Sequence, residues 1–297
     1  MTLARAIRAR GAGVSISFLR GGPTPHDRSS LASEGITLID APRANRHDVV
    51  VVDLPDPNEV TSSLSAGERL VVLDDREAFK GRAAIVVQPS LGWWAGPGRA
   101  DRVLAGYEWA PIGPAWRQVV DDAGIDHSGP PRVLVCFGGS DPGAVTARLG
   151  PTLAADPRWS TTVVVGHDYA GLRPSSVDLV QDPTDLPARV AGADVVVVGA
   201  GTMKFEVAAI GRPALLLAVA DDQLPVGPPF AATGAARWLG DGRTIDPEAV
   251  RRAVAALLDD GPAREAMATT ARRVVDGNGA DRLAAEIVAL VPPMARL

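Results

Sequence analysis

The sequence predicts an α/β protein built from two doubly wound domains, each a parallel sheet with helices on both faces. Short runs rich in valine, isoleucine and leucine alternate with helical stretches along the 297 residues. Such runs are typical of strands that are buried on both faces of a sheet. The alternation restarts after a break, HSGPPR, that contains glycine and proline. We therefore expect an N-terminal domain at 1–126 and a C-terminal domain at 132–297.

The elements of the first domain follow from its apolar runs. MTLARAIRARG predicts an amphipathic helix that ends at Gly11. NEVTSSLSAGE and PAWRQVVDDAG predict two more helices further along the domain. Strands are expected at 14–18, 36–40, 48–53, 69–75 and 83–88.

The second domain repeats this pattern with helices between its strands. PGAVTARLGPTLAA, DLPARVAG and the segment after Gly201 predict helices. Because ligands of doubly wound sheets bind beyond the carboxyl ends of the strands, a site is expected there, in a cleft between the two domains. Strands are expected at 132–137, 161–166, 177–181, 194–198 and 214–220.

Composition excludes several classes of protein. A formal charge of −5, without a basic stripe that carries aromatic residues, argues against nucleic-acid binding. The single cysteine, Cys136, lies in the apolar run VLVCF and is expected to be buried. One thiol allows no internal disulfide and no cysteine cluster for zinc, and no apolar stretch nears the ~20 residues that span a bilayer. We expect a cytoplasmic protein without a transmembrane segment, metal or cofactor.

Two strand ends of the second domain carry groups with two alternative roles. After the first strand, Asp141 can cap the following helix, while Gly138 and Gly139 would let the backbone approach a ligand closely. Structure alone and structure with ligand contact remain equal alternatives here. After the second strand, His167 is better explained as polar surface than as a functional group.

The segment VVGAGTMKFEVAAIGRP is the third strand end. GAGTMK lacks the third glycine of a dinucleotide motif and the glycine–lysine pair of a P-loop. A glycine turn that leads into a helix remains, and the N–H groups and dipole of such a helix start attract an anion. Thr202 and Glu206 share one helix face, where the carboxylate would either complement the dipole or accept hydrogen bonds from a vicinal diol. Lys204 points away from Glu206 and is expected in solvent.

The fourth strand end carries a polar cluster, ADDQ. Asp222 is either the N-cap of the next helix or, with Gln223, a group that hydrogen-bonds sugar hydroxyls. Neighbouring aspartates point apart, which argues against a paired-carboxylate site made of Asp221 and Asp222.

These segments together resemble a known family. GGSDPGAVT, ADVVVVGAGTMKFEVAAIGRP, ADDQ and DGNGADR are similar to the C-terminal domain of the nucleotide-sugar hydrolases of the pseudaminic acid pathway. Those enzymes release UDP from a UDP-linked diacetamido-trideoxy sugar and are related to the two-domain GT-B glycosyltransferases. In the first half, DVVVVDLPD, VVLDD and VLAGYEWAPIGPAW extend the likeness over most of the chain.

The resemblance implies a site and a function. The chain would bind a nucleotide diphosphate sugar, UDP-linked, and hydrolyse it to UDP and a free amino or deoxy sugar. Alternatives are a GT-B glycosyltransferase that uses the same donor site, or an inactive nucleotide-sugar-binding protein. The sugar would face Asp222 and Gln223. The nucleotide and its phosphates would contact Gly139, Ser140, Gly201, Thr202, Met203, Glu206 for the ribose, and Leu186 near the base.

One departure concerns catalysis. The family begins with a strand and a glycine-rich loop that contains a histidine, whereas TLARAIRARG matches the helix that follows them. None of His26, His47, His127 and His167 stands in that position, so no catalytic residue is assigned and we expect binding with little turnover. Either the protein starts upstream, or VSISF and DVVVVD pair directly. The two tryptophans of GWWAGPG suit core and loop packing better than an acceptor face.

Overall fold

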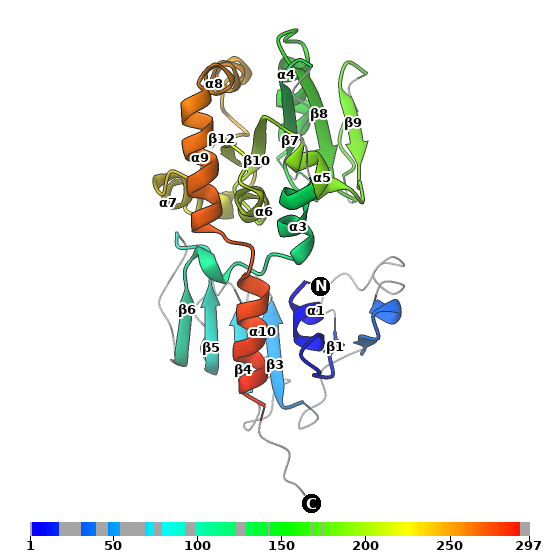
Figure 1. The fold of residues 1–297 in the computed structure, drawn as a ribbon, viewed down its shortest axis with the longest axis vertical. Helices are drawn as coiled ribbons and strands as arrows, with labels where there is room; N and C mark the ends of the chain where they lie inside the picture. The colour runs from blue at the N-terminus through cyan, green and yellow to red at the C-terminus, as the bar shows by residue number, and fades with distance from the viewer. Residues whose placement is uncertain are drawn as a thin grey trace, which may run out of the picture. The chain divides into compact units, whose positions relative to one another are not determined.

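The chain folds into two compact units in the computed structural model (Figure 1). The first unit comprises Met1–Gly113 with Asn278–Leu297, and the second comprises Pro114–Gly277. The contacts thus divide the chain at two places, whereas the predicted boundary lies at 127–131. The structure describes residues 2–17, 31–39, 47–53, 69–73, 79–92, 99–122, 129–139, 141, 143–167, 169–173 and 175–291.

The second unit is a doubly wound α/β domain with one parallel sheet. The strand order is β12-β11-β10-β7-β8-β9, so the first strand of the unit, β7, is central and has a partner on each side. This order confirms the predicted fold class for the second half. The strands are β7 (Arg132–Cys136), β8 (Ser160–Val165), β9 (Asp178–Gln181), β10 (Val195–Gly199), β11 (Ala214–Ala218) and β12 (Arg237–Asp241).

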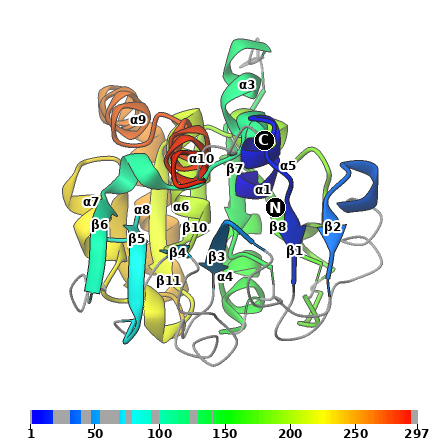
Figure 2. The ribbon, with the colours of Figure 1, turned by 90° about the horizontal axis from the view of Figure 1, so that it is seen from below.

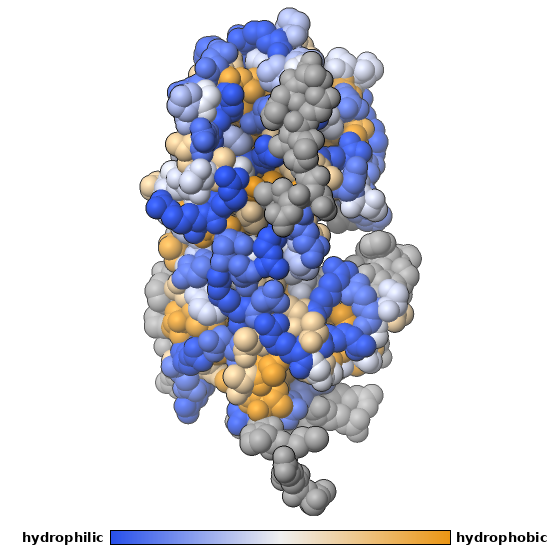
Figure 3. Space-filling model, in the orientation of Figure 1, coloured by the Kyte–Doolittle hydropathy of each residue, from blue (hydrophilic) through white to orange (hydrophobic). Residues whose placement is uncertain are grey.

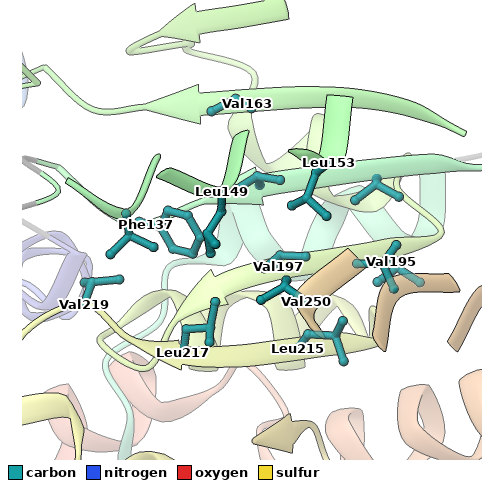
Figure 4. Packing of buried hydrophobic residues seen from close by; sticks show 14 of the residues in the cluster. Phe137, Leu149, Leu153, Val163, Val195, Val197, Leu215, Leu217, Val219 and Val250 are labelled. Atoms are coloured by element: carbon teal, nitrogen blue, oxygen red, sulfur yellow. The ribbon is translucent and has the colours of Figure 1, made fainter. Parts of the chain in front are cut away.

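Helices cover both faces of this sheet. On one face, alternate side chains of β7, β8, β10 and β11 pack against α4 and α8 in one hydrophobic cluster (Figure 4). Leu149 of α4 and Val250 of α8 are fully buried in it. The other face carries α6, which also contacts α3, α5 and α9. The helices are α3 (Pro114–Asp122), α4 (Val145–Ala154), α5 (Leu186–Ala191), α6 (Met203–Ile210), α7 (Gly227–Ala232), α8 (Pro247–Asp259) and α9 (Gly261–Val274), with a short 3₁₀ turn, η3 (Asp221–Gln223).

The first unit has a parallel sheet in the order β3-β4-β5-β6 and a separate parallel pair, β1-β2. Successive residues of β4 point to opposite faces: Val71 packs with α1 and α10, and Val72 packs in a second cluster on the other face. Both clusters are apolar, as expected for a sheet covered on two sides. The elements are α1 (Thr2–Arg8), β1 (Ser15–Ile16), β2 (Thr37–Leu38), β3 (Val49–Asp53), β4 (Arg69–Leu73), β5 (Arg82–Gln88), β6 (Arg99–Ala105), the 3₁₀ turn η2 (Tyr107–Trp109) and α10 (Gly279–Ala289).

Two strands escaped the sequence analysis, and one predicted pairing is wrong. Charged residues interrupt the apolar pattern in β6 and β12, which lie at sheet edges where such residues are tolerated. The direct pairing of VSISF with DVVVVD does not occur in the described residues. β1 pairs with β2 instead (Figure 2), and β3 pairs with β4. The helix expected at 58–68 and the tryptophan pair of GWWAGPG lie outside the described residues.

The last helix, α10, returns to the first unit, where it packs beside α1 (Figure 1). Arg10 and Arg102 form ion pairs with Asp281 and Glu286 on its polar side. On the face drawn in Figure 3, hydrophilic residues cover the upper part of α10, and more hydrophobic residues lie over its lower part. Gly279, the first residue of α10, lies so close to η2 that an added Cβ would be 1.9 Å from the carbonyl oxygen of Ala110.

Replacing Gly279 should therefore destabilise the first unit. A methyl group at that distance forces backbone apart, and overpacking of this kind typically costs about 1–3 kcal/mol. We expect Gly279→Ala to lower the free energy of unfolding in urea by that amount. Gly13→Ala is the matched control, because no described residue lies within 4 Å of a Cβ added there. Equal losses in the two variants would show that the contact with Ala110 is not tight.

Candidate functional site

The carboxyl ends of β7, β10, β11 and β12 lie at one edge of the second sheet. All neighbouring pairs in this sheet are parallel, so the segments that follow these strands emerge together. The segments are the glycine loop after β7, the turn before α6, the turn η3 after β11, and the Asp-Gly-Arg sequence that ends β12. This edge brings together most of the residues that the sequence singles out.

Gln223 joins two of these segments. Its side-chain oxygen accepts a hydrogen bond from the backbone N–H of Val219, at 3.1 Å. A Cβ added at Gly199 would lie 3.3 Å from this oxygen, and one added at Gly201 would lie 3.3 Å from the amide nitrogen of Gln223. Gln223 therefore packs directly on the glycine turn before α6, so two residues predicted for one site lie in contact.

The start of α6 presents unbonded N–H groups. In the described part of the chain, the backbone N–H groups of Gly201 and Thr202 donate no hydrogen bond. Thr202 is exposed, and its hydroxyl makes no capping hydrogen bond within the described residues. Met203 is buried, with 9% of its surface exposed, and it can offer only backbone. An anion at this position would meet both N–H groups and the positive end of the helix dipole.

Glu206 lies one turn further along α6. Within the described residues its carboxylate accepts no hydrogen bond and joins no ion pair. Burial raises the pKa of this carboxyl from 4.5 to about 7, since the apolar surroundings disfavour the charged form. Burial likewise raises the pKa of the Cys136 thiol, which is buried as predicted, to about 11. A polar ligand that donates hydrogen bonds would relieve the desolvation of Glu206.

Lys204 corrects a prediction. Only 2% of the residue is exposed, so it is not a solvated lysine. Its ammonium donates to the carbonyl oxygens of Ala200 and Gly201, at 2.9 and 3.2 Å, and stands 4.0 Å from the centre of the Phe205 ring. The prediction fails because neighbouring helices surround α6, so the side chain turns back onto the carbonyls of the preceding turn. Lys204 thereby supports the shape of the glycine turn.

The loop after β7 is held by Asp141. Asp141 is buried and adopts a left-handed conformation, with φ of 45°. Its carboxylate accepts from the backbone N–H groups of Val145 and Thr146, at 3.0 and 2.7 Å, so it caps α4 as the sequence allows. Gly139 lies against Gly166: a Cβ added at Gly166 would be 2.4 Å from the Cα atom of Gly139. The close approach seen here is between two loops, and Ser140 lies outside the described residues.

The other side of the edge carries His167 and Asp182. His167 Nδ1 lies 3.6 Å from a carboxylate oxygen of Asp182, and both side chains are mostly exposed. Leu186 begins α5 and is partly buried. In the part of the chain that is described, no hydrogen bond joins these residues to the turn before α6. Their predicted place beside a base remains a prediction.

Arg243 is a residue that the sequence analysis missed. Its Nη1 lies 2.7 Å from a carboxylate oxygen of Asp221, and its Nε and Nη2 donate to both oxygens of Asp241 at 2.9 and 2.7 Å. Hydrogen bonds from Arg243 hold the pKa of Asp241 below its ordinary value. Asp222 lies in η3 and does not cap α7, whose N-cap is Val226, so its predicted alternative as a cap is wrong. Recognising β12 as a strand would have drawn attention to the Asp-Gly-Arg sequence at its end.

No group of three or more His, Cys, Asp or Glu side chains among the described residues could hold a metal ion. None of the helices that the structure describes is both long and apolar enough to cross a bilayer.

The raised pKa of Glu206 makes stability depend on pH. The folded state binds the proton more tightly than the unfolded state, so this stability is complete below about pH 4.5 and is lost as pH rises through about 7. Relative to Glu206→Gln, the wild-type protein should lose roughly 2–3 kcal/mol of unfolding free energy between pH 5 and 8. Urea titrations at both pH values measure the difference. Glu265→Gln, an exposed position on α9, is the control, and a similar pH dependence in both variants would contradict a desolvated Glu206.

The chain is similar in sequence to two curated proteins of polysaccharide synthesis. It is 36% identical over 185 residues to the UDP-N-acetylglucosamine–N-acetylmuramyl-(pentapeptide) pyrophosphoryl-undecaprenol N-acetylglucosamine transferase of Rhodopseudomonas palustris, covering 56% of this chain and 50% of that protein. It is 25% identical over 197 residues to the spore coat polysaccharide biosynthesis protein SpsG of Bacillus subtilis, covering 62% and 57%. The chain thus spans about half the length of the curated relatives it matches.

Solved structures with the same arrangement of elements include glycosyltransferases. MurG of Acinetobacter baumannii superposes with a TM-score of 0.61 at 17% identity, over 97% of this chain and 94% of that one. HepE of Anabaena, solved in complex with UDP-glucose, superposes with a TM-score of 0.62 at 13% identity, over 97% and 94%. No family model matches the chain. The protein therefore has the α/β fold of the GT-B glycosyltransferases, with parallel sheets in two Rossmann-like domains.

Proposed function

We propose that the protein binds a UDP-linked sugar and uses it as a glycosyl donor. The nucleotide diphosphate would lie at the start of α6, with the sugar beside Asp222 and Gln223. One observation carries the proposal: within the residues that the structure describes, the N–H groups of Gly201 and Thr202 make no hydrogen bond, and the partly buried carboxylate of Glu206, one turn further on, has no partner. An anion and a diol held one helical turn apart satisfy both groups, and a nucleotide diphosphate carries both.

The role of Glu206 follows from the cost of its burial. An ionised carboxylate away from water is unfavourable unless hydrogen bonds compensate it. The two ribose hydroxyls can donate to its two oxygens, and a charge-assisted hydrogen bond contributes about 1.5–3 kcal/mol. Binding would therefore favour the ionised form of Glu206.

The role of the α6 turn is electrostatic. A diphosphate placed there accepts hydrogen bonds from fixed N–H groups and from the Thr202 hydroxyl. The same groups stabilise UDP as it departs and gains charge in either transfer or hydrolysis. Gly201 allows a ligand to approach the backbone closely. Among the described residues, only Gln223 lies within 4 Å of a Cβ added there. Gly139 and Ser140 are proposed to complete the phosphate side, and Leu186 the base side.

Glycosyl transfer is the first candidate for two reasons. One protein of similar sequence is named as an N-acetylglucosamine transferase that uses UDP-N-acetylglucosamine, and one structure of similar fold was solved with UDP-glucose. Hydrolysis is the second candidate, and the resemblance of GGSDPGAVT, GAGTMKFEVAAIGRP and ADDQ to nucleotide-sugar hydrolases supports it. The two differ only in whether water or an acceptor hydroxyl attacks the sugar. Mass spectrometry after incubation with UDP-sugars separates them: free sugar with UDP indicates hydrolysis, and UDP release only with an added glycan acceptor indicates transfer. Absence of both, with UDP bound, would leave a binding protein.

Glu206→Gln should weaken uridine binding about tenfold at pH 8, because the charged acceptor is lost. For the wild-type protein, affinity should rise about tenfold between pH 6 and 8, since only the ionised carboxylate accepts both ribose hydroxyls and its pKa is about 7. The Gln variant should show little pH dependence. Uridine is used because it carries no titrating phosphate. Calorimetric titration measures both, and equal pH profiles would remove Glu206 from the ribose site.

UDP should bind at least tenfold more tightly than uridine. The difference reflects the charge-assisted hydrogen bonds of the diphosphate, each worth about 1.5–3 kcal/mol. It should shrink with added salt, because the charges at this edge are partly exposed. Equal affinities for UDP and uridine at low salt would place the diphosphate away from the α6 turn.

A further inference from the structure

Arg243 contributes a positive charge to the edge where the diphosphate is proposed to bind. The stem of its side chain packs on the loop after β7, because a Cβ added at Gly143 would lie 2.9 Å from Arg243 Cγ and 2.7 Å from the carbonyl oxygen of Val219. Val219 in turn donates its N–H to Gln223, which contacts the glycine turn before α6. A continuous chain of contacts therefore links Arg243 to the start of α6.

The two carboxylates on Arg243 differ in kind. Asp241 accepts from three N–H groups of Arg243 (the backbone N–H at 2.9 Å, Nε and Nη2), and its side chain is only 21% exposed. This two-pronged pairing fixes the plane of the guanidinium. Asp221 meets Nη1 alone, at 2.7 Å, and its side chain is 87% exposed. Asp241 thus positions the guanidinium of Arg243, while Asp221 contacts only its Nη1 atom, in solvent.

An exposed single ion pair is weak and easily exchanged. A diphosphate carries more charge than a carboxylate and offers several acceptor oxygens to the same guanidinium. Displacing Asp221 returns its carboxylate to water at little desolvation cost, since the side chain is already mostly solvated. Exchange at Nη1 is therefore favourable for a diphosphate, while the Asp241 pairing stays in place.

We propose that Arg243 contacts the diphosphate of the bound nucleotide, and that Asp221 occupies the place of this anion in the ligand-free protein and is displaced on binding. The inference rests on the proposed function, which it extends by two residues. Asp221 acts as a built-in competitor: it lowers affinity for every ligand that carries the diphosphate and leaves uridine unaffected. It also gives Nη1 of Arg243 a partner in the ligand-free protein.

The test measures affinities for UDP, uridine and inorganic pyrophosphate by calorimetric titration at fixed ionic strength. We expect Asp221→Asn to raise affinity for UDP and pyrophosphate about threefold to tenfold, with uridine unchanged. Arg243→Gln should lower affinity for UDP and pyrophosphate about tenfold or more. In the Arg243→Gln background, adding Asp221→Asn should have no further effect, since the competitor acts only through Nη1.

The control variant is Asp178→Asn. It makes the same change in net charge at the first residue of β9. β9 is the edge strand at the other end of the strand order from β12. Its affinities should equal those of the wild-type protein, which excludes a general effect of charge. Melting curves for each variant identify loss of fold, and Asp221 is exposed enough for its variant to fold normally.

The outcomes separate this inference from the proposed function. UDP binding that is the same in wild type and Asp221→Asn would overturn the inference alone, and so would an unchanged affinity for pyrophosphate in Arg243→Gln. Pyrophosphate affinities could change among the variants as expected while UDP binds no more tightly than pyrophosphate. That result would support the anion exchange and contradict the nucleotide site. A wild-type protein that binds neither UDP nor pyrophosphate would overturn both.

Discussion

The central strands of the second unit are covered on both faces, and this burial constrains where its chemistry can lie. β7, β10 and β11 are made of aliphatic side chains and one thiol that are nearly inaccessible to solvent, apart from Arg132 at the start of β7. Hydrogen-bonding side chains are therefore pushed to the strand ends, where water or a ligand can reach them. Because every strand pair is parallel, the carboxyl ends come together at one edge, and the segments that follow β7, β10, β11 and β12 become neighbours.

The same constraint explains the character of α6. A helix packed among α3, α5 and α9 has no solvent face, so the polar residues within it need special arrangements. The ammonium of Lys204 donates hydrogen bonds to two carbonyl oxygens of the preceding turn. Glu206 has no hydrogen-bond partner among the described residues, and its pKa rises accordingly. A buried polar group that has no hydrogen-bond partner in the described part of the protein is typical of a site where a ligand supplies that partner.

Electrostatic balance differs between the two parts of the proposed site. At the start of α6 the attraction for an anion comes from N–H dipoles, which carry no net charge and remain stable without a ligand. At Arg243 the attraction comes from a full positive charge, which two aspartates offset. The first arrangement favours an anion at all times, whereas the second requires one partner to leave. Both follow from the need to avoid an uncompensated charge at the edge of an apolar sheet.

The fold class could be predicted from the sequence alone, and so could the strand-end segments that form the candidate site. Continuous valine and leucine runs identified the central strands, since burial on both faces leaves an unmistakable composition. GAGTMK and ADDQ directly follow such runs, so the sequence predicts that both segments lie at strand ends.

The tertiary structure decided what local patterns do not encode. The edge strands β6 and β12 carry charges, so their identity depends on the neighbours they pair with. The direction of Lys204 depends on helices distant in sequence, and the meeting of Asp221 with Arg243 depends on the pairing of β11 with β12. Asp221 and Arg243 are about twenty positions apart along the chain, and only the packed sheet brings them within hydrogen-bonding distance.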